Sequence, residues 1–233
     1  MLLILFDVDG TLTESFALDA AVFLDTVRKT FGFRDISEDW SSYRHVTGAG
    51  VLREIVETRL GRPPTLEEVR RVHSCIEASL RTGIEEAGGI RPIPGAGQIL
   101  ARLLGSPSEY AVALASGNWS TVARLMLDSA GLQVDGILGA YSDDELARED
   151  ICRLARRRVE ERRGCIFERV VYVGDGVWDV QAARALGYGF VGIGRGAAAV
   201  KLREAGAVEV QPDFLDAEAF LAAVERVATP LPK

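Results

Sequence analysis

Residues 2–12 have the sequence LLILFDVDGTL, an unbroken apolar run that ends in two carboxylates and a glycine. A strand that is apolar on both faces is typical of a parallel sheet covered by helices, and such sheets hold their ligands outside the carboxyl ends of the strands. Asp7 and Asp9 lie at that end. Because side chains alternate along a strand, both carboxylates are expected on one side. The stretch therefore predicts a buried strand with a chemical site at its tip.

Two carboxylates held this close together need a cation or a proton. Mg²⁺ takes oxygen ligands, commonly one or two carboxylates with waters and phosphate oxygens, so it suits Asp7 and Asp9. Gly10 lets the chain turn where a side chain would clash. The competing interpretation is an ordinary strand followed by an Asp-Gly turn, because this dipeptide is common in turns.

Length and composition narrow the class of protein. A chain of 233 residues can form one large domain, or a core with a smaller insert. The net charge of -7 and the pI near 5.0 argue against non-specific binding to nucleic acid. The odd number of cysteines, three, lacks close spacing and fits reduced thiols, and the amino-terminal apolar run is too short to cross a membrane. We therefore expect a cytoplasmic protein with no nucleic-acid or membrane partner, and no pattern indicates its oligomeric state.

The segment 16–89 shows helical patterns and no convincing strand. Its third amphipathic pattern begins with a capping box formed by Thr65 and Glu68. The junctions at 13–15 and at 88–95 have the character of hinges, and the second is rich in glycine and proline. These features predict a small all-helical cap domain at 16–89, inserted after the first strand.

After the insert, strand and helix patterns alternate. This alternation predicts crossover units and an α/β fold, a Rossmann-like parallel sheet with helices on both faces. The core domain would then comprise residues 1–15 and 90–233. The expected strands are 110–115, 136–140, 170–173, 190–193 and, more weakly, 208–210, and the expected helices are 120–130, 146–161, 177–186 and 197–204.

Two more of these strands end in polar groups. Ser116, Gly117 and Asn118 follow the strand 110–115, and a hydroxyl beside free N–H groups at a helix amino terminus favours a phosphate. The alternative is that Ser116 or Asn118 only caps the next helix.

The stretch 170–179, VVYVGDGVWD, again places an acid, Asp175, at a strand end, and Asp179 follows four residues later. An aspartate that caps the next helix is the alternative here. The chain thus has three strand tips that carry acid, hydroxyl and acid.

These stretches resemble the motifs of the haloacid dehalogenase-like superfamily. Residues 7–11 match its Asp-x-Asp-Gly-Thr motif, Ser116 matches its second motif, and 174–179 match Gly-Asp-x-x-x-Asp. The resemblance spans nearly the whole chain. It implies a hydrolase of the phosphatase type with a helical cap after the first motif, similar to phosphoglycolate phosphatases.

The resemblance also implies a role for each acid. Asp7 would attack phosphorus and form an aspartyl-phosphate, and Asp9 would protonate the leaving alkoxide and then deprotonate water. Mg²⁺ would be held by Asp7, Asp175 and the backbone carbonyl of Asp9, with Asp179 as a supporting carboxylate. Ser116 would hold the phosphoryl group, supported by Gly117 and Asn118.

The sequence departs from the family at one position. The family has a lysine about 25 residues before the Gly-Asp motif, and the nearest match is Arg148. The resemblance assigns Arg148 to catalysis and to binding of the phosphoryl group, since arginine keeps the charge although it is larger and planar. The alternative is a surface arginine that pairs with Asp143, Asp144 or Glu145.

The function implied is Mg²⁺-dependent hydrolysis of a small phosphorylated metabolite. A phosphomutase of the same superfamily, similar to β-phosphoglucomutase, would share every core residue. A phosphonate hydrolase would need a cap lysine, and the insert contains only Lys29. A non-catalytic binding module that lost turnover through the change to Arg148 is the alternative outside the enzymes. The glycine-rich residues 47–50 are either a plain turn or a lid loop that contacts the substrate.

Overall fold

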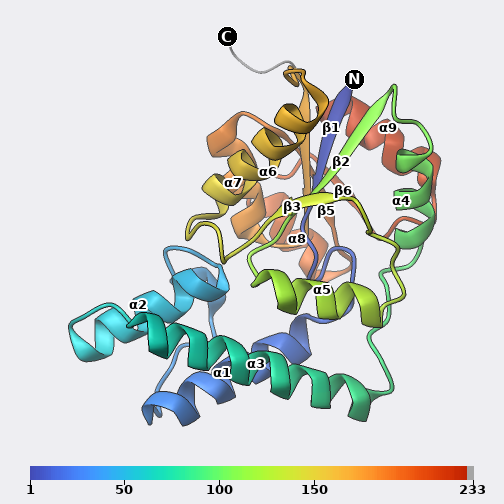
Figure 1. Ribbon diagram of the computed structural model, residues 1–233. Coiled ribbons are helices and arrows are strands. Elements are labelled where there is room, and N and C mark those ends of the chain that lie inside the picture. The colour runs from blue at the N-terminus through green and yellow to red at the C-terminus, as the bar shows by residue number, and fades with distance from the viewer. Residues whose placement is uncertain (230–233) are drawn as a thin grey trace.

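The structure is a computed structural model, and it describes residues 1–229. Within that range one parallel sheet of six strands has the order β3-β2-β1-β4-β5-β6, which confirms the predicted α/β fold (Figure 1). β1 lies between β2 and β4, and its Leu5 is in register with Ala113 and Tyr172. The strands are β1 (Leu2–Phe6), β2 (Tyr110–Ala115), β3 (Leu138–Ala140), β4 (Val170–Gly174), β5 (Gly189–Ile193) and β6 (Glu209–Gln211).

β1 is buried on both faces of the sheet, which explains its continuous apolar sequence. Leu2, Ile4 and Phe6 join the hydrophobic cluster on one face, whereas Leu3 and Leu5 join the cluster on the other. This is the alternation that strand geometry requires. The position of β1 among other buried strands carries its carboxyl end to the middle of the sheet edge.

Helices cover both faces of the sheet (Figure 1). One face is covered by α4 (Ala96–Leu104) and α9 (Ala217–Val227), neither of which the sequence pattern singled out. The other face is covered by α6 (Arg148–Arg163), α7 (Val177–Leu186) and α8 (Ala197–Glu204). α5 (Ser120–Ser129) follows β2 and packs against the helices inserted after β1. No helix within residues 1–229 is long and apolar enough to span a membrane.

The helical insert, residues 16–87, lies across the carboxyl end of β1 (Figure 1). It contains α1 (Phe16–Phe31), the short 3₁₀ helix η1 (Trp40–Ser42), α2 (Gly48–Leu60) and α3 (Leu66–Ala87). The capping box of Thr65 and Glu68 at the start of α3 is present, as predicted. The glycine-rich residues 47–50 are not a free loop: Thr47 is the N-cap of α2, and its hydroxyl accepts a hydrogen bond from Gly50 N.

The two connections between the helical insert and the sheet run side by side. Glu14 N donates to Arg91 O over 2.8 Å, and Ile93 N donates to Leu12 O over 2.9 Å. Apolar side chains of the insert belong to the same cluster as one face of the sheet. The insert is therefore packed against the rest of the chain as well as tethered to it, and the domain division at residues 15 and 90 stays a prediction.

Candidate active site

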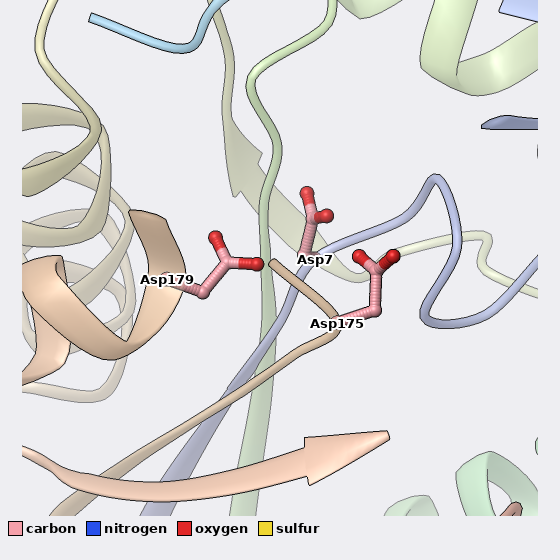
Figure 2. Close-up of side chains that lie close together, drawn as sticks. All are labelled: Asp7, Asp175 and Asp179. Atoms are coloured by element: carbon pink, nitrogen blue, oxygen red, sulfur yellow. The ribbon is translucent and has the colours of Figure 1, made fainter. Parts of the chain in front are cut away.

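Three carboxylates meet at the carboxyl ends of β1 and β4. Asp7 follows β1, Asp175 follows β4, and Asp179 comes from the first turn of α7. Each offers an oxygen, and these oxygens lie within 4.8 Å of one another. Figure 2 shows Asp7 and Asp175 extending past the strand ends while Asp179 points toward them. They meet because β1 and β4 are neighbouring parallel strands.

Gly10 makes room for this cluster. Its φ of 78° lies in the left-handed region that other residues rarely adopt. A Cβ atom at this position would lie 2.1 Å from a carboxylate oxygen of Asp175. A glycine is therefore required here both by the turn and by the neighbouring acid.

Asp9 faces the same cavity as Asp7, as the sequence predicted, but stands outside the three-carboxylate cluster. Its Oδ1 accepts a hydrogen bond from the Ser15 hydroxyl over 2.5 Å. Burial raises the pKa of Asp9 well above its usual range, and the nearby carboxylate of Asp19 raises it further. The Asp9 carboxyl is therefore suited to hold a proton.

Burial and mutual repulsion dominate the electrostatics of the three-carboxylate cluster. Burial raises the pKa of Asp7 to about 7, although the Arg148 guanidinium opposes this effect. The pKa of Asp175 is also raised, by burial and then by Asp179 and Asp7. Oxygen donors that are crowded and poorly hydrated form the donor set that a hard divalent cation prefers. The three residues thus fit the Mg²⁺ ion that the resemblance implies.

Arg148 is buried, with 8% of its surface exposed, and supplies a positive charge to these acids. Its Nη1 lies 3.3 Å from Asp7 Oδ1 and 3.0 Å from Asp179 Oδ1. Its Nη2 donates to the carbonyl oxygen of Val46, in the helical insert, over 2.7 Å. Arg148 is therefore not the surface arginine of the alternative interpretation.

The Arg148 side chain fits because residue 117 has no side chain. A Cβ atom on Gly117 would lie 2.2 Å from Nη2 of Arg148. Nε of Arg148 is buried and has no hydrogen-bond partner among residues 1–229. A buried donor without a partner is costly unless a ligand satisfies it.

Tyr172, in the middle of β4, belongs to the site although sequence analysis did not identify it. Its hydroxyl receives a hydrogen bond from Arg148 Nη1 over 3.1 Å. The same hydroxyl lies 3.0 Å from Asp179 Oδ1 and 3.1 Å from Ala115 O, either of which can accept its proton. The sequence does carry one indication of this role: Tyr172 is the only side chain with a hydroxyl in the apolar strand 170–173, and a buried tyrosine hydroxyl usually has a hydrogen-bond partner.

Ser116 and Asn118 line the cavity beside Asp7. Ser116 is buried, its hydroxyl accepts from Asn118 N over 3.3 Å, and its proximity to Asp7 lowers the pKa of that carboxyl. Trp119 is the N-cap of α5, so neither Ser116 nor Asn118 caps that helix. Both side chains therefore remain available to the site.

The helical insert forms the roof of the cavity. α1 contributes Phe16, Asp19 and Phe23, and η1 contributes Trp40. Burial raises the pKa of the half-buried Asp19 to about 7, and a hydrogen bond with Asn118 opposes the shift. Sequence analysis missed Asp19, which stands between apolar residues on α1.

Hydrogen bonds join the roof to the loops that follow β2 and β3. The Thr47 hydroxyl donates to Leu146 O over 2.8 Å, and Gly48 N donates to Gly117 O over 2.7 Å. Ala49 N donates to the Ser142 hydroxyl over 2.7 Å. Together with the contact between Arg148 and Val46, these bonds hold the insert against the site.

A parallel sheet with acids at the ends of its central strands, roofed by helices inserted after the first strand, defines an α/β protein with a covered acidic site. The family model for haloacid dehalogenase-like hydrolases matches residues 1–187. The chain belongs to this family of hydrolases.

Solved structures share the fold over nearly their full lengths. A hydrolase from Pseudomonas syringae has a TM-score of 0.72 and 21% identity, with 98% of this chain and 100% of that chain covered. A conserved haloacid dehalogenase-like protein from Agrobacterium tumefaciens has a TM-score of 0.59 and 25% identity, with coverages of 96% and 98%. CbbY from Rhodobacter sphaeroides, solved with phosphate, has a TM-score of 0.66 and 22% identity, with coverages of 92% and 95%. No curated protein matches the sequence.

Proposed function

We propose that the protein is a Mg²⁺-dependent phosphomonoester hydrolase that acts on a small phosphorylated metabolite through an aspartyl-phosphate. The observation that carries this proposal is the arrangement of charged and polar side chains around Asp7. Its buried carboxyl lies 3.3 Å from Arg148 Nη1 and lines a cavity with Asp9 and Ser116. Membership of the hydrolase family supports the proposal.

Asp7 acts as the nucleophile. One carboxylate oxygen attacks phosphorus, forms a new P–O bond and displaces the alkoxide whose P–O bond breaks. Asp9, whose pKa is raised by burial, gives its proton to that alkoxide. It then takes a proton from the water that hydrolyses the aspartyl-phosphate, so phosphate is released and both acids return to their initial states.

Donors around Asp7 hold the phosphoryl group. The Ser116 hydroxyl, the N–H group of Gly117 and the Asn118 side chain lie just after β2, and Arg148 adds a positive charge beside Asp7. Charge-assisted hydrogen bonds from fixed donors stabilise the negative charge of a transferring phosphoryl group.

Asp7 and Asp175 would hold Mg²⁺, with the backbone carbonyl of Asp9 as a proposed third ligand and Asp179 as the supporting carboxylate. Bound there, the ion would supply positive charge that offsets the repulsion between the carboxylates and the phosphate oxygens. Arg148 and Tyr172 both contact Asp179, and these contacts fix the orientation of its carboxylate.

The helical insert acts as the cap domain, residues 16–89 of the predicted division. Its contacts with the loops after β2 and β3 exclude bulk water from the reacting atoms, and its cavity-lining side chains face the organic part of the substrate.

The cysteines Cys75, Cys152 and Cys165 are all unpaired, which agrees with the proposed cytoplasmic location.

Hydrolysis of p-nitrophenyl phosphate with Mg²⁺, by the wild type and by Asp7→Asn, tests the proposal. The variant should lose at least about a thousandfold in kcat, because the amide is not a nucleophile. Asp25→Asn, an exposed acid paired with Lys29, is the matched control and should retain wild-type activity. An Asp7→Asn enzyme that kept more than about a tenth of the activity would exclude the mechanism. Release of inorganic phosphate distinguishes hydrolysis from the phosphomutase alternative.

A further inference from the structure

The cavity has an aromatic wall, which consists of Phe16, Phe23 and Trp40 from the helical insert and Trp178 from α7. Phe16 contacts Trp40 and Trp178 at ring-centroid distances of 6.3 and 6.4 Å, and Phe23 contacts Trp40 at 5.5 Å. All four line the cavity that contains Asp7. The organic part of a bound phosphomonoester would therefore meet ring faces and edges.

One acid accompanies this aromatic wall. Asp19 is the only charged side chain that the helical insert contributes to the cavity lining within residues 1–229. The only base in the same lining is Arg148, whose Nη atoms are already bound by Asp7, Asp179 and Val46. Above its raised pKa of about 7, Asp19 offers a negative charge to the leaving group, and the roof contributes no positive charge to the lining within residues 1–229.

We propose, on the basis of the proposed function, that Asp19 and the aromatic wall select phosphomonoesters whose leaving group carries an ammonium group. A carboxylate attracts an ammonium ion in a poorly hydrated cavity and repels a carboxylate or a second phosphate. Aromatic faces attract the same cation through their quadrupoles. Both features of the roof therefore favour an amino alcohol phosphate.

Two other features of this region lead to expectations that differ from the selection of an ammonium group by Asp19. Asp19 lies in the first turn of α1, where an acid also stabilises the helix dipole, but that role gives no preference among substrates. Arg44 and His45 line a neighbouring cavity that shares Val46, Arg148 and Trp178 with the active site. A leaving group with a second anion would need to reach that cavity.

The test compares kcat/KM for three alkyl phosphates with the Mg²⁺-loaded enzyme. O-Phosphoethanolamine carries the ammonium group, propyl phosphate is its uncharged isostere, and phosphoglycolate carries a carboxylate. The wild type should prefer O-phosphoethanolamine over propyl phosphate by about tenfold or more, and phosphoglycolate should be the poorest. In Asp19→Asn the ratio for the first two should fall to near one. Asp25→Asn, on the exposed face of the same helix, should keep the wild-type ratio.

The possible failures point to different conclusions. A wild type that prefers phosphoglycolate, or an Asp19→Asn enzyme with the wild-type ratio, overturns the assignment of Asp19. If Asp19→Asn does not fold, the order of kcat/KM among the three substrates with the wild type still tests the proposal. Hydrolysis of p-nitrophenyl phosphate that depends on Asp7, with no preference for the ammonium ester, overturns this inference and leaves the proposed function intact. Absence of all phosphatase activity overturns both.

Discussion

Substitution of Arg148 tests how the site holds its positive charge. Nη1 contacts Asp7 and Asp179, and Nη2 contacts the Val46 carbonyl of the helical insert. Arg148→Ala removes all of these contacts and leaves the two acids without their cation. Arg148→Lys restores a charge but has a single terminal nitrogen, which cannot reach the acids and the insert as a fork does.

The expected losses follow from these contacts. Removing one charge-assisted contact to the transferring group in a water-poor site costs about 2 to 4 kcal/mol of transition-state stabilisation, or roughly 30- to 1000-fold in rate. Arg148→Lys should recover part of this loss. It should stay about tenfold or more below the wild type, because a hydrogen bond from a charged donor contributes about 1.5 to 3 kcal/mol.

The assay is kcat/KM on one aryl phosphate at saturating Mg²⁺, with thermal melting to confirm that each variant is folded. Arg153→Ala is the control, because Arg153 lies on the same helix, its side chain is 56% exposed, and Asp150 is its only ion-pair partner among residues 1–229. It should be nearly silent. If Arg148→Ala matches this control, the positive charge of Arg148 has no part in catalysis.

Two further predictions concern the acids. Asp9→Asn should slow an alkyl phosphate far more than an aryl phosphate, because a good leaving group needs less protonation, and equal losses in kcat would contradict the acid role of Asp9. The stabilisation of the protein by Mg²⁺ should be larger at pH 8 than at pH 6. With the pKa of Asp7 at about 7 in the absence of metal, a proton competes with the ion below that pH and not above it. A melting-temperature shift that is equal at the two pH values would contradict this coupling.

Much of the fold could be predicted because its central strands are buried on both faces. β1 and β4 are continuous apolar runs that show no helical period, and acids follow each of them directly. α4 escaped prediction because it is short and its N-cap, Gly95, has no side chain to form a capping hydrogen bond. The start of α9 is marked in the sequence by Asp216, whose carboxylate caps the first turn of the helix. α2 begins at Gly48 because Thr47 caps it, although glycines there favoured a turn.

Site residues that directly follow a strand could be predicted from the sequence, whereas those elsewhere on the fold could not. Asp7, Ser116 and Asp175 could be placed from sequence because each follows a strand directly, and parallel strands bring their carboxyl ends to one edge. Asp19 could not be placed, because its contact with the cavity depends on how α1 packs across the sheet edge. Tyr172 is a similar case, since β4 alone does not show which buried groups its hydroxyl meets.

The close approach of Gly117 to Arg148 limits how this protein can diverge. With a guanidinium at 148, any side chain at 117 would lie 2.2 Å from Nη2, so the glycine is tied to the arginine and not only to the loop. With a shorter lysine at 148 the contact with Nη2 is relieved, and a Cβ atom at 117 is left with a tight contact of 3.0 Å to the Val46 carbonyl oxygen. A smaller residue at 148 therefore eases a change at 117 to alanine and not to a larger residue. The two positions are therefore expected to covary among relatives, with the order of substitution set by steric hindrance.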